Sequence, residues 1–118
     1  MLSKTNLTNP IVSRLLPLNP YRIILFGSHA HGKADEDSDI DLLVVLDSAS
    51  ISQTYEERMR KRLMVRDRLH DINRRTAIDL IVYTKAEYTM LEREGTSFVN
   101  EIQRTGMVLY EKADERPA

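Results

Sequence analysis

The feature that most constrains the fold of this chain is an unbroken run of five apolar residues, Leu42–Leu46, which directly follows two carboxylates. The run predicts a buried β-strand over Asp39–Leu46, because a short apolar run next to a polar loop is typical of a sheet interior. Asp39 and Asp41 stand at its start, two positions apart. Since residues i and i+2 of a strand point to the same face, these carboxylates are expected to project together, about 6–7 Å apart along the backbone.

The rest of the chain alternates between strand-like and helix-like patterns. Three further segments have the β-branched and aromatic composition of strands: Tyr21–Phe26, Thr76–Thr84 and Met107–Glu111. Apolar residues three and four apart predict a helix from about residue 52 to residue 73, and shorter helices are expected before Gly95 and Gly106. Asn9 and Pro10 predict the N-cap and first-turn proline of a short helix that Pro17 ends. Strands alternating with helices indicate an α/β (α+β) fold with a small mixed sheet.

Length, charge and cysteine content narrow the class of protein. At 118 residues the chain is expected to form a single domain, with a core over about residues 21–111 and a frayed tail at 112–118. It has no cysteine, which excludes disulfides and thiolate metal sites and fits a cytoplasmic location. The N-terminal MLSKTNLTNP lacks the apolar segment of a signal peptide, and no apolar run is long enough to cross a bilayer. A net charge of −1 gives the chain as a whole no attraction to nucleic acid or to an anionic membrane.

A third carboxylate, Asp79, enters its own predicted strand in a similar way. If the two strands are neighbours, Asp39, Asp41 and Asp79 converge at one edge of the sheet. Like charges about 4 Å apart repel by about 4 kcal/mol at an effective dielectric constant near 20, so a compensating cation is expected. Mg²⁺ fits this role, because it is held by one or two carboxylates together with substrate phosphates. The alternative is that all three are solvated residues at strand starts and turns, since a bare D-x-D pattern is common.

The pair Gly27-Ser28 favours the metal site over that alternative. It closes one predicted strand and opens a turn, where backbone N–H groups and the serine hydroxyl can hold an anion. Glycine also lets the backbone approach a phosphate closely. Gly27-Ser28, ten intervening residues and then Asp39-x-Asp41 resemble the signature of the DNA polymerase beta nucleotidyltransferase superfamily.

The resemblance extends over most of the chain, from about Tyr21 to Glu111. The segment LFGSHAHGKADEDSDIDLLVV is most similar to the small stand-alone members, the minimal (MNT) nucleotidyltransferases. Asp79, in AIDLIVY, matches the family's third carboxylate, and SFVNEIQRTGMVLYE is similar in style to the same group. One departure is His31, which stands where these proteins commonly carry the arginine of G-S-x-A-R-G. It removes whatever contact that arginine makes and leaves the three carboxylates in place.

The resemblance implies a polymerase-beta-like core, with a mixed sheet packed by helices on one side. It also implies Mg²⁺-dependent transfer of AMP from ATP to a hydroxyl group. The catalytic residues would be Asp39, Asp41 and Asp79, which would hold two magnesium ions, and Asp79 would also orient the attacking hydroxyl. Gly27 and Ser28 would bind the phosphates of the nucleotide.

A protein partner is implied in the same way. Stand-alone MNT proteins typically pair with a HEPN toxin, an RNase, and act as its antitoxin, so the expected acceptor is a tyrosine of such a toxin. The chain is then expected to form a hetero-oligomer with the toxin, or a homodimer, without direct contact to nucleic acid or membrane. Two other functions stay open: an antitoxin that masks its partner sterically through a vestigial site, and a metal-dependent nuclease, since D-x-D also serves phosphodiester cleavage.

Basic residues recur every four positions along the predicted long helix. They are Arg58, Arg62, Arg66 and His70, and they lie within its apolar arc. One interpretation is that their aliphatic stems cover the edge of the core while the charged groups reach solvent. The other is a basic stripe that faces an acidic partner or a phosphate.

Overall fold

The computed structural model of this protein describes residues 4–27 and 39–113. Its centre is a four-stranded mixed sheet in the order β3-β2-β1-β4. The strands are β1 (Pro20–Phe26), β2 (Ile40–Leu46), β3 (Ile78–Thr84) and β4 (Met107–Glu111). β1 runs antiparallel to both β2 and β4, whereas β2 and β3 are parallel. The mixed-sheet α/β fold predicted from the sequence is therefore confirmed.

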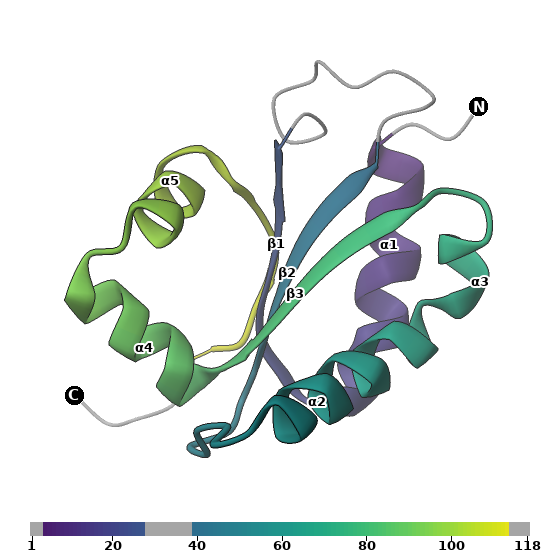
Figure 1. The fold of residues 1–118 in the computed structure, drawn as a ribbon. Helices are drawn as coiled ribbons and strands as arrows, with labels where there is room; N and C mark the ends of the chain where they lie inside the picture. Colours follow the sequence, from purple (N-terminus) through teal and green to yellow (C-terminus); the bar gives the residue numbers. More distant parts are fainter. Residues whose placement is uncertain (1–3, 28–38, 114–118) are drawn as a thin grey trace.

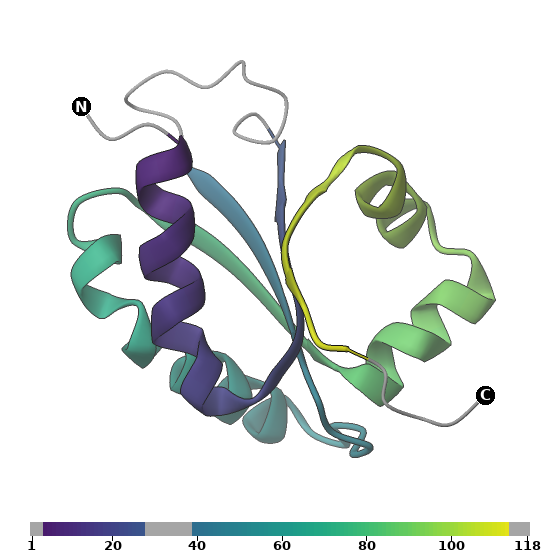
Figure 2. The same ribbon diagram turned by 180° about the vertical axis from the view of Figure 1, so that it is seen from behind.

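Helices cover both faces of this sheet (Figures 1 and 2). On one face lie α1 (Lys4–Leu15), α2 (Tyr55–Arg68) and the short α3 (His70–Asn73), and a 3₁₀ turn, η1 (Leu16–Leu18), links α1 to β1. On the other face lie α4 (Lys85–Glu94) and α5 (Ser97–Thr105). The expectation of helices on one side is therefore wrong, although the fold class is right.

The central strand β2 explains why both faces are covered. Its alternate residues enter two separate cores, because successive side chains of a strand point to opposite faces. Leu42 and Val44 pack with α1 and α2, whereas Leu43 and Val45 pack with α4 and α5. All four side chains are fully buried. An unbroken apolar run in a central strand requires a cover on each side, and the C-terminal helices supply the second one.

Side-chain caps fix the starts of the helices that flank the site. Thr54 caps α2 by accepting a hydrogen bond from the backbone N–H of Glu57. Thr84 and Glu87 form a reciprocal capping box at the start of α4. The first helix differs from its prediction, because α1 begins at Lys4 and carries Pro10 in its interior. A proline inside a helix costs a backbone hydrogen bond, and burial of Ile11 and Leu15 in the core stabilises the helix on its C-terminal side.

Within the described residues, no helix has the length and apolar character that a membrane span requires.

Candidate active site

Two of the three predicted carboxylates occupy paired positions on neighbouring strands. In the parallel ladder of β2 and β3, Asp41 is the register partner of Asp79. Both belong to the face that carries α4 and α5, because the next alternate residues of their strands, Leu43 and Ile81, pack in the core on that face. Neighbouring strands lie about 4.8 Å apart, so the backbones of the two aspartates are that close. The structure thus brings Asp41 and Asp79 together from distant parts of the chain.

Asp39 lies just outside this ladder. It is exposed and precedes the first residue of β2. The start of the strand is fixed beside it, because the N–H of Ile40 donates a 2.9 Å hydrogen bond to the carbonyl of Ala77. Ser28, the predicted phosphate-binding hydroxyl, lies outside the described residues, as does His31.

Gly27, the first residue after β1, lies directly against the side chain of Asp41. Phe26 is the register partner of Asp41 across the antiparallel β1–β2 pair, and Gly27 follows it with φ of +73°. A Cβ atom at Gly27 would overlap Oδ2 of Asp41 and reach its Cβ at 3.3 Å. Glycine is therefore required here twice, once for the left-handed backbone and once for the space that the carboxylate fills.

Replacing Gly27 with alanine is expected to disturb the carboxylate more than the fold. The positive φ alone costs an alanine about 1–2 kcal/mol, and the added methyl group must push the Asp41 side chain out of its position. We expect a modest loss of stability in urea denaturation and, for the nucleotidyl transfer that the sequence resemblance implies, a rate loss of about 10²-fold, the effect of small misplacements at a reacting centre. Gly95→Ala, which has a similar φ of +65° and open space around it, is the matched control. It should share the stability loss and keep the transfer rate.

The carboxylates at this end of the sheet supply part of what a magnesium ion needs. Asp41 and Asp79 offer carboxylate oxygens, the ligands that Mg²⁺ prefers, and their register places them at one end of the same face. Within residues 4–27 and 39–113, however, no three acidic or histidine side chains are gathered closely enough to hold an ion. The carboxylate donors and the placement of Asp41 and Asp79 fit the metal, whereas Asp39 does not form a three-ligand group with them.

An aromatic pair lies beside the carboxylates. Phe26 packs edge-to-face against Phe98 of α5, with ring centroids 5.7 Å apart and an angle of 86° between the planes. Because Phe26 is the cross-strand partner of Asp41, α5 is held over the same end of the sheet that carries the two acids. The second helical layer therefore forms a wall of the candidate site.

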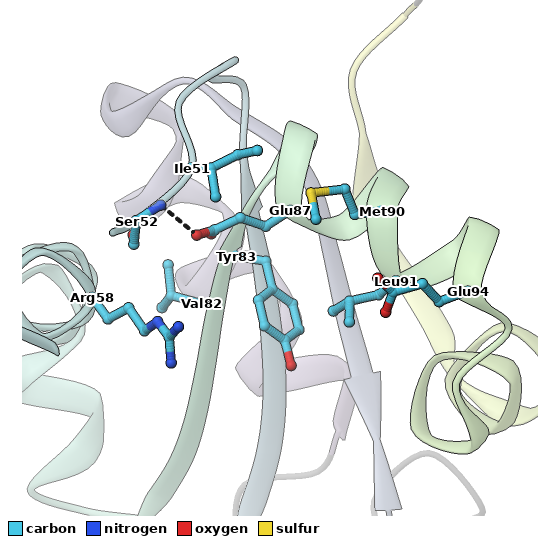
Figure 3. Close-up of a pocket in the computed structure, with 9 residues that line it drawn as sticks. All are labelled: Ile51, Ser52, Arg58, Val82, Tyr83, Glu87, Met90, Leu91 and Glu94. Carbon is cyan, nitrogen blue, oxygen red and sulfur yellow. Dashed lines mark hydrogen bonds between the residues drawn. The ribbon is translucent and has the colours of Figure 1, made fainter. Parts of the chain in front are cut away.

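The basic residues of α2 lie along β3, which is an edge strand of the sheet. Arg62 donates a 3.2 Å hydrogen bond from Nε to the carbonyl of Leu80. Arg62 and Arg66 line a pocket of about 280 Å³ that includes Ile78 and Leu80 of β3. Arg58 reaches a second pocket, of about 300 Å³, between α2, the end of β3 and α4 (Figure 3). The stripe predicted from the sequence thus follows the outer edge of β3.

Glu87 and Tyr83 give the second pocket its electrostatic character. Burial raises the pKa of Glu87, but the backbone N–H groups of Thr84 and Ser52 donate to its carboxylate at 2.8 Å each, and the net effect is a lowered pKa. Burial raises the pKa of the Tyr83 hydroxyl, with a smaller contribution from the charge of Glu87, whereas Arg58 opposes the rise. The pocket is therefore lined by the Arg58 guanidinium, the Tyr83 phenol, the Glu87 carboxylate that two backbone donors already occupy, and the exposed Glu94.

Glu87→Gln is expected to remove a pH-dependent contribution to stability. Because the pKa of Glu87 is lowered in the folded state, this contribution is present above the ordinary pKa of 4.5 and disappears as the pH falls through the lowered value. The wild type should be more stable than the variant at pH 7 by about 1 kcal/mol, a typical value for a helix cap, and the difference should shrink as the pH falls below the ordinary pKa of 4.5. Urea denaturation at several pH values measures this, with Glu94→Gln on the exposed side of α4 as control. A constant difference across the pH range would contradict the assignment.

Sequence reasoning did not identify Glu87 or Tyr83. The pattern Thr84-x-x-Glu87 is a readable capping-box signal, and it could have predicted the bond to Thr84. The second bond, to Ser52, joins residues 35 positions apart and depends on the tertiary fold. The contact between Gly27 and Asp41 also has no local signal.

Comparisons with known proteins identify a family and similar folds. Residues 15–115 match the family described as polymerase beta, nucleotidyltransferase. No curated protein matches the chain. Similar folds occur in a putative nucleotidyltransferase from Sulfolobus solfataricus, with a TM-score of 0.56 and 20% identity, where the match covers 90% of this chain and 78% of the other.

Two toxin–antitoxin structures are similar as well. One was crystallised with AMP-PNP and has a TM-score of 0.53 and 20% identity, covering 89% of this chain and 73% of the other. The other is a mutant of MntA-HpeT, with a TM-score of 0.52 and 18% identity over the same shares. At these identities the similarity shows a shared fold.

Proposed function

The chain belongs to the polymerase beta nucleotidyltransferase family, and we therefore propose that it transfers AMP from ATP to a hydroxyl group of a partner protein. The observation that carries this proposal is the register of Asp41 with Asp79 on one face of the sheet, with Gly27 closed against Asp41.

In the proposed reaction the acceptor oxygen bonds to the α-phosphorus of ATP. The bond between the α- and β-phosphates breaks, pyrophosphate leaves, and the hydroxyl proton is released. Asp79, at the start of the edge strand, is assigned to orienting the acceptor hydroxyl by accepting its hydrogen bond. Gly27 and Ser28 are assigned to the outgoing phosphates. Catalysis then comes from positioning and from electrostatics, without a covalent intermediate.

Magnesium is the proposed cofactor, with Asp39, Asp41 and Asp79 as its ligands. When bound, it would supply the positive charge that offsets the triphosphate and the developing charge on the leaving group. The role of the chain is to hold the carboxylates next to the bound triphosphate, and Gly27 leaves the space that the Asp41 carboxylate fills.

We propose a toxin of the HEPN type as the partner and a tyrosine as the acceptor, so that the chain acts as an antitoxin in the cytoplasm. The shared fold with two toxin–antitoxin structures, one crystallised with AMP-PNP, supports a toxin partner and an adenine nucleotide. The further details rest on the resemblance of the sequence to the MNT proteins.

The direct test is to purify the chain with its bound partner and incubate the complex with ATP and Mg²⁺. Mass spectrometry should find one or more adenylate groups on a tyrosine of the partner, and chelation with EDTA should abolish the product. Parallel reactions with GTP, CTP and UTP measure the nucleotide preference, and a partner with that tyrosine changed to phenylalanine is the control. An unmodified partner at saturating ATP would reject the transferase and leave steric masking as the function.

A further inference from the structure

We propose that the outer edge of β3 is the docking surface for an extended acidic segment of the partner protein. This β3-edge surface consists of the arginine row Arg58, Arg62 and Arg66 of α2 and of the two pockets that the row lines, with volumes of about 300 and 280 Å³. Identifying the segment with the AMP acceptor rests on the proposed function, whereas the binding itself does not.

The first argument is unbalanced charge. Within the described part of the chain, the ion pairs join other residues, and none of the three arginines of the row pairs with a carboxylate. Arg62 uses one donor on the carbonyl of Leu80, and its remaining guanidinium donors are left for a ligand. Three guanidinium groups on one helix face repel one another, and a negatively charged partner relieves that repulsion.

The second argument is spacing. The three arginines are four residues apart, so successive side chains stand about 6 Å apart along the helix axis. Alternate residues of an extended peptide are about 6.6 Å apart and point to the same side. A segment with carboxylates at alternate positions can therefore meet all three arginines, while its intervening side chains point away from them. A single small anion would use only one member of the row.

The third argument is that the edge of β3 is already blocked against strand addition. The N–H of Ile78 donates to Oδ1 of Asn73, the carbonyl of Leu80 accepts from Arg62, and the N–H of Thr84 donates to Glu87. These bonds use backbone groups that a further strand would need. A docked segment is therefore held by side chains, and acidic residues are the natural partners of this row.

The lining of the pockets favours a peptide over a nucleic acid. Val82, Met90 and Leu91 form apolar walls beside Arg58, with Tyr83 between them (Figure 3). Leu69, Ile78 and Leu80 do the same beside Arg62 and Arg66. Arginine next to apolar side chains is typical of protein interfaces.

The position of the surface connects it to the candidate active site. The pocket beside Arg62 and Arg66 is lined by Ile78 and Leu80, the two residues that flank Asp79 in β3. These two residues point to the face of α1 and α2, whereas Asp79 belongs to the face of α4 and α5, so a segment docked along the row must bend around the β3 edge for its acceptor residue to reach Asp79. Docking here would raise the local concentration of the acceptor hydroxyl without a contact to ATP.

The binding test uses a fluorescent synthetic peptide of about ten residues that alternates glutamate with leucine or valine, long enough to span the arginine row. Arg58→Glu with Arg66→Glu should weaken its binding to the full chain at least tenfold, whereas Arg60→Glu with Arg104→Glu, an equal change in charge at exposed residues away from the surface, should change it less than twofold. Arg58→Gln with Arg66→Gln is the milder pair if the reversal disturbs folding. Equal losses in test and control pairs, or no loss in either, would overturn the proposal.

Two further probes complete the test. The same peptide with lysine in place of glutamate should not bind, and a single-stranded RNA of similar length should bind more weakly than the acidic peptide. Tighter, arginine-dependent RNA binding would overturn the proposal in favour of a nucleic-acid surface.

In the transfer assay, Arg58→Glu with Arg66→Glu should raise KM for the partner while KM for ATP is unchanged. If the proposed function is wrong, the wild type transfers no AMP. If this inference is wrong, the wild type and the arginine variants have the same transfer rate and the same affinity for the peptide.

Discussion

Asp41→Asn is expected to lower the rate of AMP transfer by about 10³-fold or more and to leave the chain folded. Asp41 is the register partner of Asp79 and fills the space that Gly27 leaves, so it stands at the centre of the proposed site. Asparagine keeps the size of the side chain and removes its charge. Loss of the proposed metal ligand would remove several kcal/mol of transition-state stabilisation, and each 1.4 kcal/mol is a factor of ten in rate.

This expectation has a control and a second readout. Asp67→Asn makes the same change at an exposed residue of α2 and should keep the wild-type rate. Magnesium should raise the melting temperature of the wild type, because a ligand that binds only the folded state stabilises it, and Asp41→Asn should lose that shift. The double variant Asp39→Asn, Asp41→Asn separates the two antitoxin mechanisms. If it still neutralises the proposed toxin partner, steric masking is the function, and if neutralisation is lost, chemistry is required.

Leu42→Ala and Leu43→Ala are each expected to lower the free energy of unfolding by about 2–5 kcal/mol, out of a total of about 5–15 kcal/mol for a small domain. The two leucines are neighbours in β2 and both are fully buried, but they belong to different cores. Leu42 packs on the side of α1 and α2, and Leu43 packs on the side of α4 and α5. A sheet covered on one face only would make one of these substitutions nearly neutral.

Urea denaturation of both variants measures these costs. Leu63→Ala in α2 is the matched control, because Leu63 is 44% exposed, and the same substitution there should change stability by less than about 0.5 kcal/mol. A large loss for Leu42→Ala together with a small one for Leu43→Ala would mean that α4 and α5 contribute little to the folded core. The arrangement with a packed core on each face of the sheet would then be contradicted.

Several parts of the fold could be predicted from local sequence. The four strands appear where β-branched and apolar runs are bounded by polar or glycine residues, and β4 has the predicted bounds, Met107–Glu111. The start of α4 is encoded by the capping residues Thr84 and Glu87. Pro10 misled the prediction of α1, since a proline at the start of a helix is the commoner arrangement, and here the helix continues on its N-terminal side.

The layer arrangement and the arginine row show what local patterns leave open. An apolar run in β2 predicts burial, but it does not say which helices cover each face. No local pattern assigns the C-terminal helices to a separate layer. A stripe of arginines on a helix is equally consistent with solvent exposure and with a binding surface. Only the place of β3 at the edge of the sheet, with Leu80 bonded to Arg62, gives the stripe a definite neighbour.

By itself, the sequence determined that this chain has an α/β fold with a mixed sheet and that aspartates stand at the starts of two of its strands. These features depend on apolar runs, caps and turn residues, which act over a few positions of the chain. Which strands became neighbours was decided by the tertiary structure. The order β3-β2-β1-β4 sets Asp79 against Asp41 and brings Gly27 onto the same carboxylate. The physical reason is that strand pairing and two-sided core packing depend on contacts between residues far apart in the chain, and no local pattern specifies them.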